Sequence, residues 1–150
     1  MYDCCVEEIS IRDMTMADYD AVTRVWMEAG LTYRPHGRDR RGKMQVEMEC
    51  GGALFVVAEA AGEVVGVVLG THDGRRAWVN RLAVKPAYQR RGLALRLVRA
   101  VEQRADGLGI DIVAALIESD NQASLAFFHA IGYLHSPEVE YFSKRRSPDT

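Results

Sequence analysis

Apolar and polar residues alternate near the start of the chain and then recur at helical spacing. The stretch Ile9-Ser10-Ile11-Arg12 alternates as an edge strand does. Thr15 follows as a candidate N-cap, and Asp18 three residues later completes a variant of the capping box. An apolar stripe at helical spacing then runs up to Gly30, which ends the helix; the stripe consists of Val22, Val25, Trp26 and Ala29. The first two predicted elements are therefore a strand and a helix.

The middle of the chain has a strand pattern. A basic stretch from Arg34 to Lys43 separates the first helix from a short helical piece that ends near Cys50. Three apolar, β-branched segments follow at 54–59, 64–69 and 77–84, with a tight hairpin turn at Gly62-Glu63 between the first two. Pro86 ends the third strand because proline cannot donate a ladder hydrogen bond. The clearest helix spans 91–108, with apolar residues on one face and arginines on the other.

The last third of the chain predicts a strand, a helix and a strand. The nearly continuous apolar run at 110–117 is typical of a strand buried on both faces. A short helix at 121–131 and a final strand at 138–144 follow. The order β-α-α-β-β-β-α-β-α-β predicts an α/β fold with a mixed (α+β) sheet, because two antiparallel hairpins precede the crossover helix. The 150 residues and the 48% hydrophobic content predict one domain over 1–150, with 1–8 and 146–150 as tails.

Composition narrows the classes of partner. The net charge of −2 does not favour nucleic acid or an anionic membrane. The three cysteines and four histidines have no disulfide or metal-ligand spacing, which predicts reduced thiols, a cytoplasmic location and no metal. No apolar run approaches the ~20 residues of a membrane helix, and the start of the chain lacks a signal-peptide pattern.

A strand, a glycine-containing loop and a long helix form the most informative unit of the sequence. From Arg81 to Arg104 the chain has seven Arg or Lys residues and one acid, Glu102. The first N–H groups of a helix are unpaired and carry partial positive charge, and Gly92 leaves room for a phosphate to approach them. The unit predicts a pyrophosphate site. The alternative interpretation is an ordinary strand-to-helix turn followed by a helix with a solvated basic face, which has the same spacing.

The same unit resembles a known family. The run Leu82-Ala83-Val84-Lys85-Pro86-Ala87-Tyr88-Gln89-Arg90-Arg91-Gly92-Leu93-Ala94 is similar to the central signature of the GNAT acetyltransferase superfamily. Asn121 opens a helix that closes in Gly132-Tyr133, which resembles the second motif of that superfamily, and the element order matches from Ile9 to Lys144. Within the superfamily, the loop is most similar to the ribosomal-protein alanine acetyltransferase group and to related bacterial members of unassigned substrate.

The resemblance implies an acetyl-CoA-dependent N-acetyltransferase, with acetyl-CoA as co-substrate and no metal. It implies that backbone groups of Leu82 and Val84 meet the thioester and pantetheine arm, that the amides of 90–95 cradle the pyrophosphate, and that Asn121 binds the pantetheine. The full cofactor-binding set carried over is Leu82, Ala83, Val84, Gln89, Arg90, Arg91, Gly92, Leu93, Ala94, Leu95 and Asn121. Independently, an open strand edge beside Val84 suits an arm made of amides.

The usual catalytic acid and base of the superfamily have no counterpart here. Phe128 stands where relatives often carry a tyrosine acid, and Trp78 and Leu116 stand where they often carry a glutamate. Glu118 is the candidate base, because a partly desolvated carboxylate at a strand end has a raised pKa. A solvated loop acid beside the helix start at Asn121 is the alternative interpretation. The expected mechanism is direct attack of the amine in a ternary complex, driven mainly by positioning.

Two residues close to Phe128 in sequence are further candidates for the acid. Tyr133 and His129 both carry a proton, but packing or surface roles explain them equally well.

The sequence predicts an amine acceptor and leaves its identity open between a protein N-terminus, a lysine, an amino acid and another small amine. Four arginines in 33–41 suggest an acceptor with an anionic group, since guanidinium pairs bidentately with carboxylate or phosphate; a solvated loop is the alternative. A non-catalytic acyl-CoA-binding or sensing domain is the rival function, because the usual acid and base are missing. Nucleic acid is disfavoured, because the chain lacks a P-loop Lys-Ser/Thr and interleaved aromatic residues. Relatives often form homodimers, but the sequence does not fix the oligomeric state.

Overall fold

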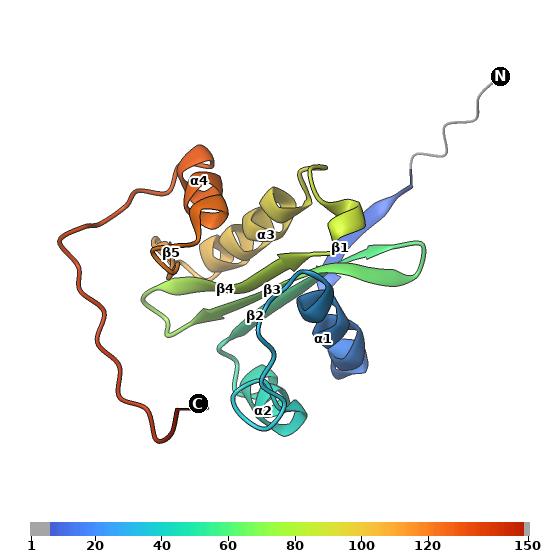
Figure 1. The fold of residues 1–150 in the computed structure, drawn as a ribbon, viewed down its shortest axis with the longest axis horizontal. Coiled ribbons are helices and arrows are strands. Elements are labelled where there is room, and N and C mark those ends of the chain that lie inside the picture. The colour runs from blue at the N-terminus through green and yellow to red at the C-terminus, as the bar shows by residue number, and fades with distance from the viewer. Residues whose placement is uncertain (1–6, 149–150) are drawn as a thin grey trace.

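The computed structural model describes residues 7–148, which form a curved sheet covered by helices on both faces (Figure 1). In chain order the elements are β1 (Ile9–Asp13), the 3-10 turn η1 (Met16–Asp18), α1 (Tyr19–Glu28), α2 (Arg41–Glu49), β2 (Ala53–Ala60), β3 (Glu63–His72), β4 (Ala77–Val84), the 3-10 turn η2 (Pro86–Tyr88), α3 (Leu93–Gly107), β5 (Val113–Ala115) and α4 (Gln122–Ala130). The strands lie in the order β1-β2-β3-β4-β5, antiparallel up to β4, and β5 pairs with β4 in parallel. The α/β class with a mixed sheet is confirmed.

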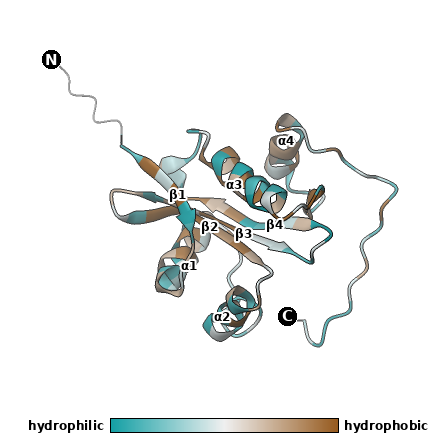
Figure 2. Ribbon diagram, turned by 180° about the vertical axis from the view of Figure 1, so that it is seen from behind, coloured by the Kyte–Doolittle hydropathy of each residue, from teal (hydrophilic) through white to brown (hydrophobic). Residues whose placement is uncertain are grey.

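Two apolar cores lie on opposite faces of the sheet. Val57 and Val67 point into the core beneath α1, while Val56 and Val68 point into the core beneath α3. Because neighbouring residues of a strand face opposite sides, a strand buried on both faces must be apolar at nearly every position. The central strands are accordingly hydrophobic along most of their length, whereas the helices mix hydrophilic and hydrophobic residues (Figure 2).

Two glycines bring α3 close to β3. A Cβ at Gly66 would lie 3.1 Å from the Leu97 side chain, and one at Gly70 would lie 2.7 Å from the Leu54 carbonyl oxygen and 2.9 Å from Val101. Side chains at these two positions would push the helix outward. The glycines therefore fix the height of α3 above the sheet, and with it the position of the loop that precedes α3.

The last strand predicted from the sequence was wrong. Residues 138–144 form no strand, and every residue from 134 to 148 is exposed. The strand expected at 110–117 is also shorter than predicted: β5 has three residues, all half-buried. The physical reason is its place at the edge of the sheet, where only β4 pairs with it. The start of the first helix was predicted correctly, since Thr15 and Asp18 form a capping box, although the first turn is 3-10.

Candidate functional site

β4 has a bulge next to the point where its pairing with β5 ends, and the unpaired edge of β4 beyond that point, at 80–84, is called the β4–β5 gap. Val67 pairs with Ala83 and Leu69 with Asn80, so two residues of β4 oppose the single residue between them. One of the two is Arg81, whose φ of 54° lies in the left-handed region. A bulge bends its strand and increases the local twist. Pairing between β4 and β5 covers only Ala77–Val79 of β4, so the rest of the strand has a free edge toward β5.

The free edge exposes alternate backbone groups of β4. The Lys85 N–H donates to the Val65 carbonyl at 2.9 Å. Along β4 the backbone groups of successive residues point alternately toward β3 and away from it, and this bond fixes which residues do which. Lys85 and Ala83 therefore bond toward β3, while Val84 and Leu82 face the gap. Within the expected cofactor set, Leu82 and Val84 thus lie on the open edge and Ala83 belongs to the internal ladder. The Val84 carbonyl already accepts a hydrogen bond from Gln89 Nε2 at 3.0 Å, which ties the loop to the strand.

The loop ends in a helix start with free N–H groups. Gly92 is the N-cap of α3 with a φ of 73°, and no side chain caps the helix. The Gly92 carbonyl accepts from the Arg96 N–H at 3.2 Å, so the amides of Leu93, Ala94 and Leu95 precede the first intrahelical donor. A Cβ at Gly92 would meet no atom within 4 Å, so the space beside the cap is open. Open amides with the positive end of a helix dipole form an anion site.

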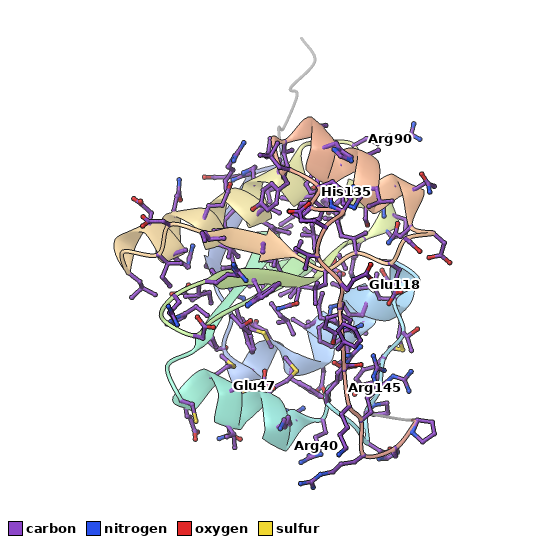
Figure 3. All side chains as sticks on the ribbon, turned by 90° about the vertical axis from the view of Figure 1, so that its left-hand side faces the viewer. Arg40, Glu47, Arg90, Glu118, His135 and Arg145 are labelled. Carbon is purple, nitrogen blue, oxygen red and sulfur yellow. The ribbon has the colours of Figure 1, made fainter. Side chains whose placement is uncertain are left out.

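The two loop arginines differ in their surroundings. Arg90 is exposed, has a φ of 63° and lies at the outer end of the molecule (Figure 3). Arg91 packs over the Tyr88 ring, 5.1 Å from guanidinium carbon to centroid, and lies 3.9 Å from Glu7. Both are close enough in sequence to the cap to add positive charge to the anion site.

The arginines farther along α3 are bonded to the protein itself. Arg96 donates to the Ile9 carbonyl at 2.9 Å, and Arg104 pairs with Asp13 at 2.7 Å. Arg99 pairs with Glu102. The first two contacts attach α3 to β1 and the third lies within α3, and together they explain most of the local excess of basic residues without a polyanionic partner.

The residues of the second motif have packing and capping roles. Asn121 caps α4, and its Oδ1 accepts from the Ser124 N–H at 3.1 Å, which leaves its Nδ2 as a donor. Phe128 is buried and packs edge-on against Tyr133, with ring centroids 5.0 Å apart. The Tyr133 hydroxyl is buried without a hydrogen-bond partner, and desolvation raises its pKa to about 12. Glu102 and Arg99 of α3 also act on this pKa, Glu102 raising it and Arg99 lowering it.

The candidate base lies at the surface. Glu118 is exposed, as Figure 3 shows, so the partial desolvation expected of it is wrong. Trp78 is half-buried beneath the Arg76 guanidinium, and Leu116 is 57% exposed. On the same strand as Trp78, Asn80 donates to the Thr71 hydroxyl at 3.2 Å. Among residues 7–148, the positions usual for the acid and base therefore hold no proton carrier.

A buried ion pair joins the segment between α1 and α2 to the bulge of β4, and sequence reasoning missed it. Arg81 lies 3.3 Å from Asp39, with side chains 16% and 5% exposed. The Arg81 guanidinium also donates to the Thr32 carbonyl at 2.6 Å and stacks 4.4 Å over Trp26, whose indole N–H donates to the Arg81 carbonyl at 3.3 Å. The Tyr19 hydroxyl donates to the Asp39 carbonyl at 2.7 Å. The two partners are 42 residues apart, so no local pattern reveals them.

The same segment carries positive charge next to this pair. Burial lowers the pKa of Arg81, Asp39 opposes the shift, and Arg38 and Arg34 lower the pKa further. Those two arginines are thus close enough to Arg81 to repel its charge. Arg41, in contrast, pairs with Asp20 at 2.9 Å.

Other kinds of site find no support in the described part of the chain. Residues 7–148 contain no group of three or more His, Cys, Asp or Glu side chains placed to hold a metal. None of the helices in that range is long and apolar enough to span a membrane. A hollow of about 430 Å³ lies away from the β4–β5 gap, between Met14, Phe55 and Leu108.

Comparison with known proteins agrees with this geometry. Residues 14–133 match the family described as the Acetyltransferase (GNAT) family. An acetyltransferase of Sodalis glossinidius (strain morsitans) is 30% identical over 141 residues, which cover 94% of this chain and 98% of the relative. A solved aminoglycoside N-acetyltransferase AAC(6')-Iy in complex with CoA has a TM-score of 0.78 at 17% identity, covering 96% of this chain and 99% of that one. The solved PaiA N-acetyltransferase of Thermoplasma acidophilum, also in complex with CoA, has a TM-score of 0.74 at 19% identity, covering 83% of this chain and 89% of that one.

The chain belongs to the GNAT family of acetyltransferases. The family is one of acetyltransferases, which confirms the resemblance carried by the loop and the two motifs.

Proposed function

We propose that this protein transfers the acetyl group of acetyl-CoA to a primary amine by direct attack in a ternary complex. The observation that carries the proposal is the free edge of β4 beside the uncapped start of α3. An amide-containing arm fits the edge at Leu82 and Val84, and a pyrophosphate fits the amides that follow Gly92. Two matched solved structures are complexes with CoA, which supports CoA as the kind of ligand that this fold binds.

Acetyl-CoA supplies an activated thioester, whose thiolate is a fairly good leaving group. The new bond forms between the amine nitrogen and the acetyl carbon, the carbon–sulfur bond breaks, and the proton of the amine passes to solvent or to the thiolate. The protein contributes mainly by holding both substrates in contact. Glu118, an exposed carboxylate after β5, is the candidate base that takes this proton through water before it reaches solvent or the thiolate.

The cofactor site is tested by acetyl-CoA calorimetry on three proteins: wild type, Gly92→Asp and Gly92→Asn. Asn and Asp have nearly the same shape and both tolerate a positive φ, so their difference isolates charge. We expect the Asp variant to bind at least about tenfold more weakly than the Asn variant, because its carboxylate repels the pyrophosphate. Equal affinities would exclude the start of α3 as the phosphate site.

We further propose that the acceptor carries a carboxylate or phosphate near its amine. Arg34 and Arg38 support this, because they lie beside buried Arg81 and form no ion pair with an acid within residues 7–148. A polyamine would be repelled there. The test is the KM of anionic and neutral amines for an Arg34→Gln/Arg38→Gln variant, with Arg24→Gln, an exposed residue of α1, as control. A rise in KM restricted to anionic amines is expected, and an equal rise for neutral ones would contradict the proposal.

The alternative function is a non-catalytic acyl-CoA-binding domain, favoured by Phe128, Trp78 and Leu116 at the usual acid and base positions. Thiol release with a panel of amines separates the two. Binding of acetyl-CoA without thiol release on any amine would support the alternative.

A cytoplasmic location stays a prediction.

A further inference from the structure

A carboxylate that precedes β1 lies against the cofactor loop. Glu7 Oε1 accepts a hydrogen bond from the Tyr88 hydroxyl of η2 at 2.9 Å, although the two residues are 81 positions apart. Two residues after Glu7, the Ile9 carbonyl accepts from Arg96 of α3 at 2.9 Å. Because η2 precedes the loop and Arg96 follows it, these bonds hold the start of β1 beside the loop. Figure 1 shows β1 and η2 at the same end of the molecule.

The same carboxylate faces the arginine next to the helix cap. Glu7 Oε2 lies 3.9 Å from Arg91 Nη1, and the two side chains are 39% and 52% exposed. No other acid within residues 7–148 pairs with Arg91. An exposed ion pair at this distance is weak, so an anion with more charge can displace the carboxylate.

We propose that Glu7 competes with the phosphates of acetyl-CoA for Arg91. In the empty protein the carboxylate partly neutralises the arginine, and the pyrophosphate takes the arginine over when the cofactor binds. The pyrophosphate displaces Glu7 because it also meets the open amides after Gly92. Glu7 therefore sets the affinity for the cofactor through Arg91 and is not itself a cofactor contact. This inference rests on the cofactor site proposed at the start of α3.

Tyr88 keeps the carboxylate in place during the exchange. Its ring packs against the core beneath α3, and its hydroxyl bonds to one oxygen of Glu7 while Arg91 approaches the other. The bond to Glu7 raises the pKa of the Tyr88 hydroxyl, which stays a donor at neutral pH. Arg91 can thus turn to a phosphate without releasing Glu7. Because CoA has the same phosphates as acetyl-CoA, the competition weakens the binding of product and cofactor alike.

Calorimetry with acetyl-CoA and with CoA tests the competition on wild type, Glu7→Gln and Glu8→Gln. Glutamine keeps the size of the side chain and still accepts from Tyr88, but it has no charge. Glu8 is the matched control, because it is exposed and forms no hydrogen bond or ion pair within residues 7–148. At low salt Glu7→Gln should bind both ligands about two- to fivefold more tightly than wild type, and Glu8→Gln within about 1.5-fold of it. An unchanged or lower affinity in Glu7→Gln would overturn the proposal.

A double-variant cycle tests whether Glu7 acts through Arg91. In an Arg91→Gln background, Glu7→Gln should no longer raise the affinity, because there is no arginine left to compete for. Circular dichroism checks that each variant is folded, since both positions lie outside the two cores. A gain as large as that in the wild-type background would show that Glu7 is only a nearby negative charge, and it would refute the exchange.

The same titrations distinguish failure of this inference from failure of the proposed function. A wild type that binds neither acetyl-CoA nor CoA would contradict the proposed cofactor site, and the competition with it. Binding by wild type that Glu7→Gln leaves unchanged would contradict the competition alone.

Discussion

At the scale of single residues, the most consequential contact is the Arg81–Asp39 pair. A buried charge is costly unless a partner and further hydrogen bonds satisfy it. Asp39 also accepts from the Arg34 N–H at 2.9 Å, so one carboxylate holds both the β4 bulge and the segment before α2. The shape of the proposed acceptor site therefore depends on Asp39, which belongs to no sequence motif.

Replacement of Asp39 should reveal this dependence. Asp39→Ala leaves the Arg81 charge buried without a partner, and we expect a loss of about 3 kcal/mol in unfolding free energy. Asp20→Ala is the control, because it breaks a pair whose side chains are 52% and 72% exposed; it should cost less than about 1 kcal/mol. Urea unfolding measures both. Equal losses would mean that burial of the Arg81 pair has no energetic consequence.

A Tyr133→Phe variant distinguishes a packing role of Tyr133 from a catalytic one. Its hydroxyl is buried without a partner, so Tyr133→Phe should leave the unfolding free energy unchanged or raise it by about 1 kcal/mol, with acetyl transfer intact. In Tyr19→Phe, by contrast, the lost bond to Asp39 should cost about 1–2 kcal/mol. A stable Tyr133→Phe protein with a much lower kcat would instead identify this tyrosine as the acid.

At the scale of elements, the junction of β1 and α1 depends on an ionised side chain. Asp18 accepts two hydrogen bonds from Arg12, at 2.8 and 2.9 Å, and one from the Thr15 N–H at 2.8 Å. The bonds from Arg12 are the main reason that the Asp18 pKa is lowered from its ordinary value of 3.8, with the Thr15 amide adding to the shift. The same residue thus caps the turn and joins it to the strand.

Acid should weaken this junction. Because the folded pKa lies below the unfolded one, Asp18 stabilises the protein above about pH 4, and this contribution is lost as the pH falls through the folded pKa. Thermal unfolding from pH 7 to pH 3 should show Asp18→Asn less stable at pH 7 but with a shallower fall below pH 4. Parallel curves for the variant and wild type would contradict this assignment.

Elements whose signals are local were the ones that the sequence predicted well. The β2–β3 hairpin turns at Ala61 and Gly62, both at positive φ, one residue before the expected turn at Gly62-Glu63, and α3 begins at Leu93, two residues after the predicted start at Arg91. Turn residues, caps and helical stripes act over a few positions, so they can be read without the rest of the fold. The strand at 138–144 failed because a strand needs a neighbour, and no local pattern states which edge supplies it.

At the scale of the whole molecule, the two ends of the sheet differ. At β2 and β3 both faces are covered and the ladders are long. Toward β5 the ladder shortens to three pairs and the sheet opens. The candidate substrate gap lies at this open end, where the edge of β4 is unpaired.

The sequence by itself determined the class of fold, the order of most elements and the loop that begins α3, because periodicity and glycine positions act locally. It also predicted the enzyme class, through two motifs with specific spacing. Only the tertiary structure decided that Glu118 is exposed, that the Tyr133 hydroxyl is buried without a hydrogen-bond partner, and that Asp39 meets Arg81. Burial and pairing between distant residues depend on how strands and helices pack, and the bulge of β4 sets that packing at the site.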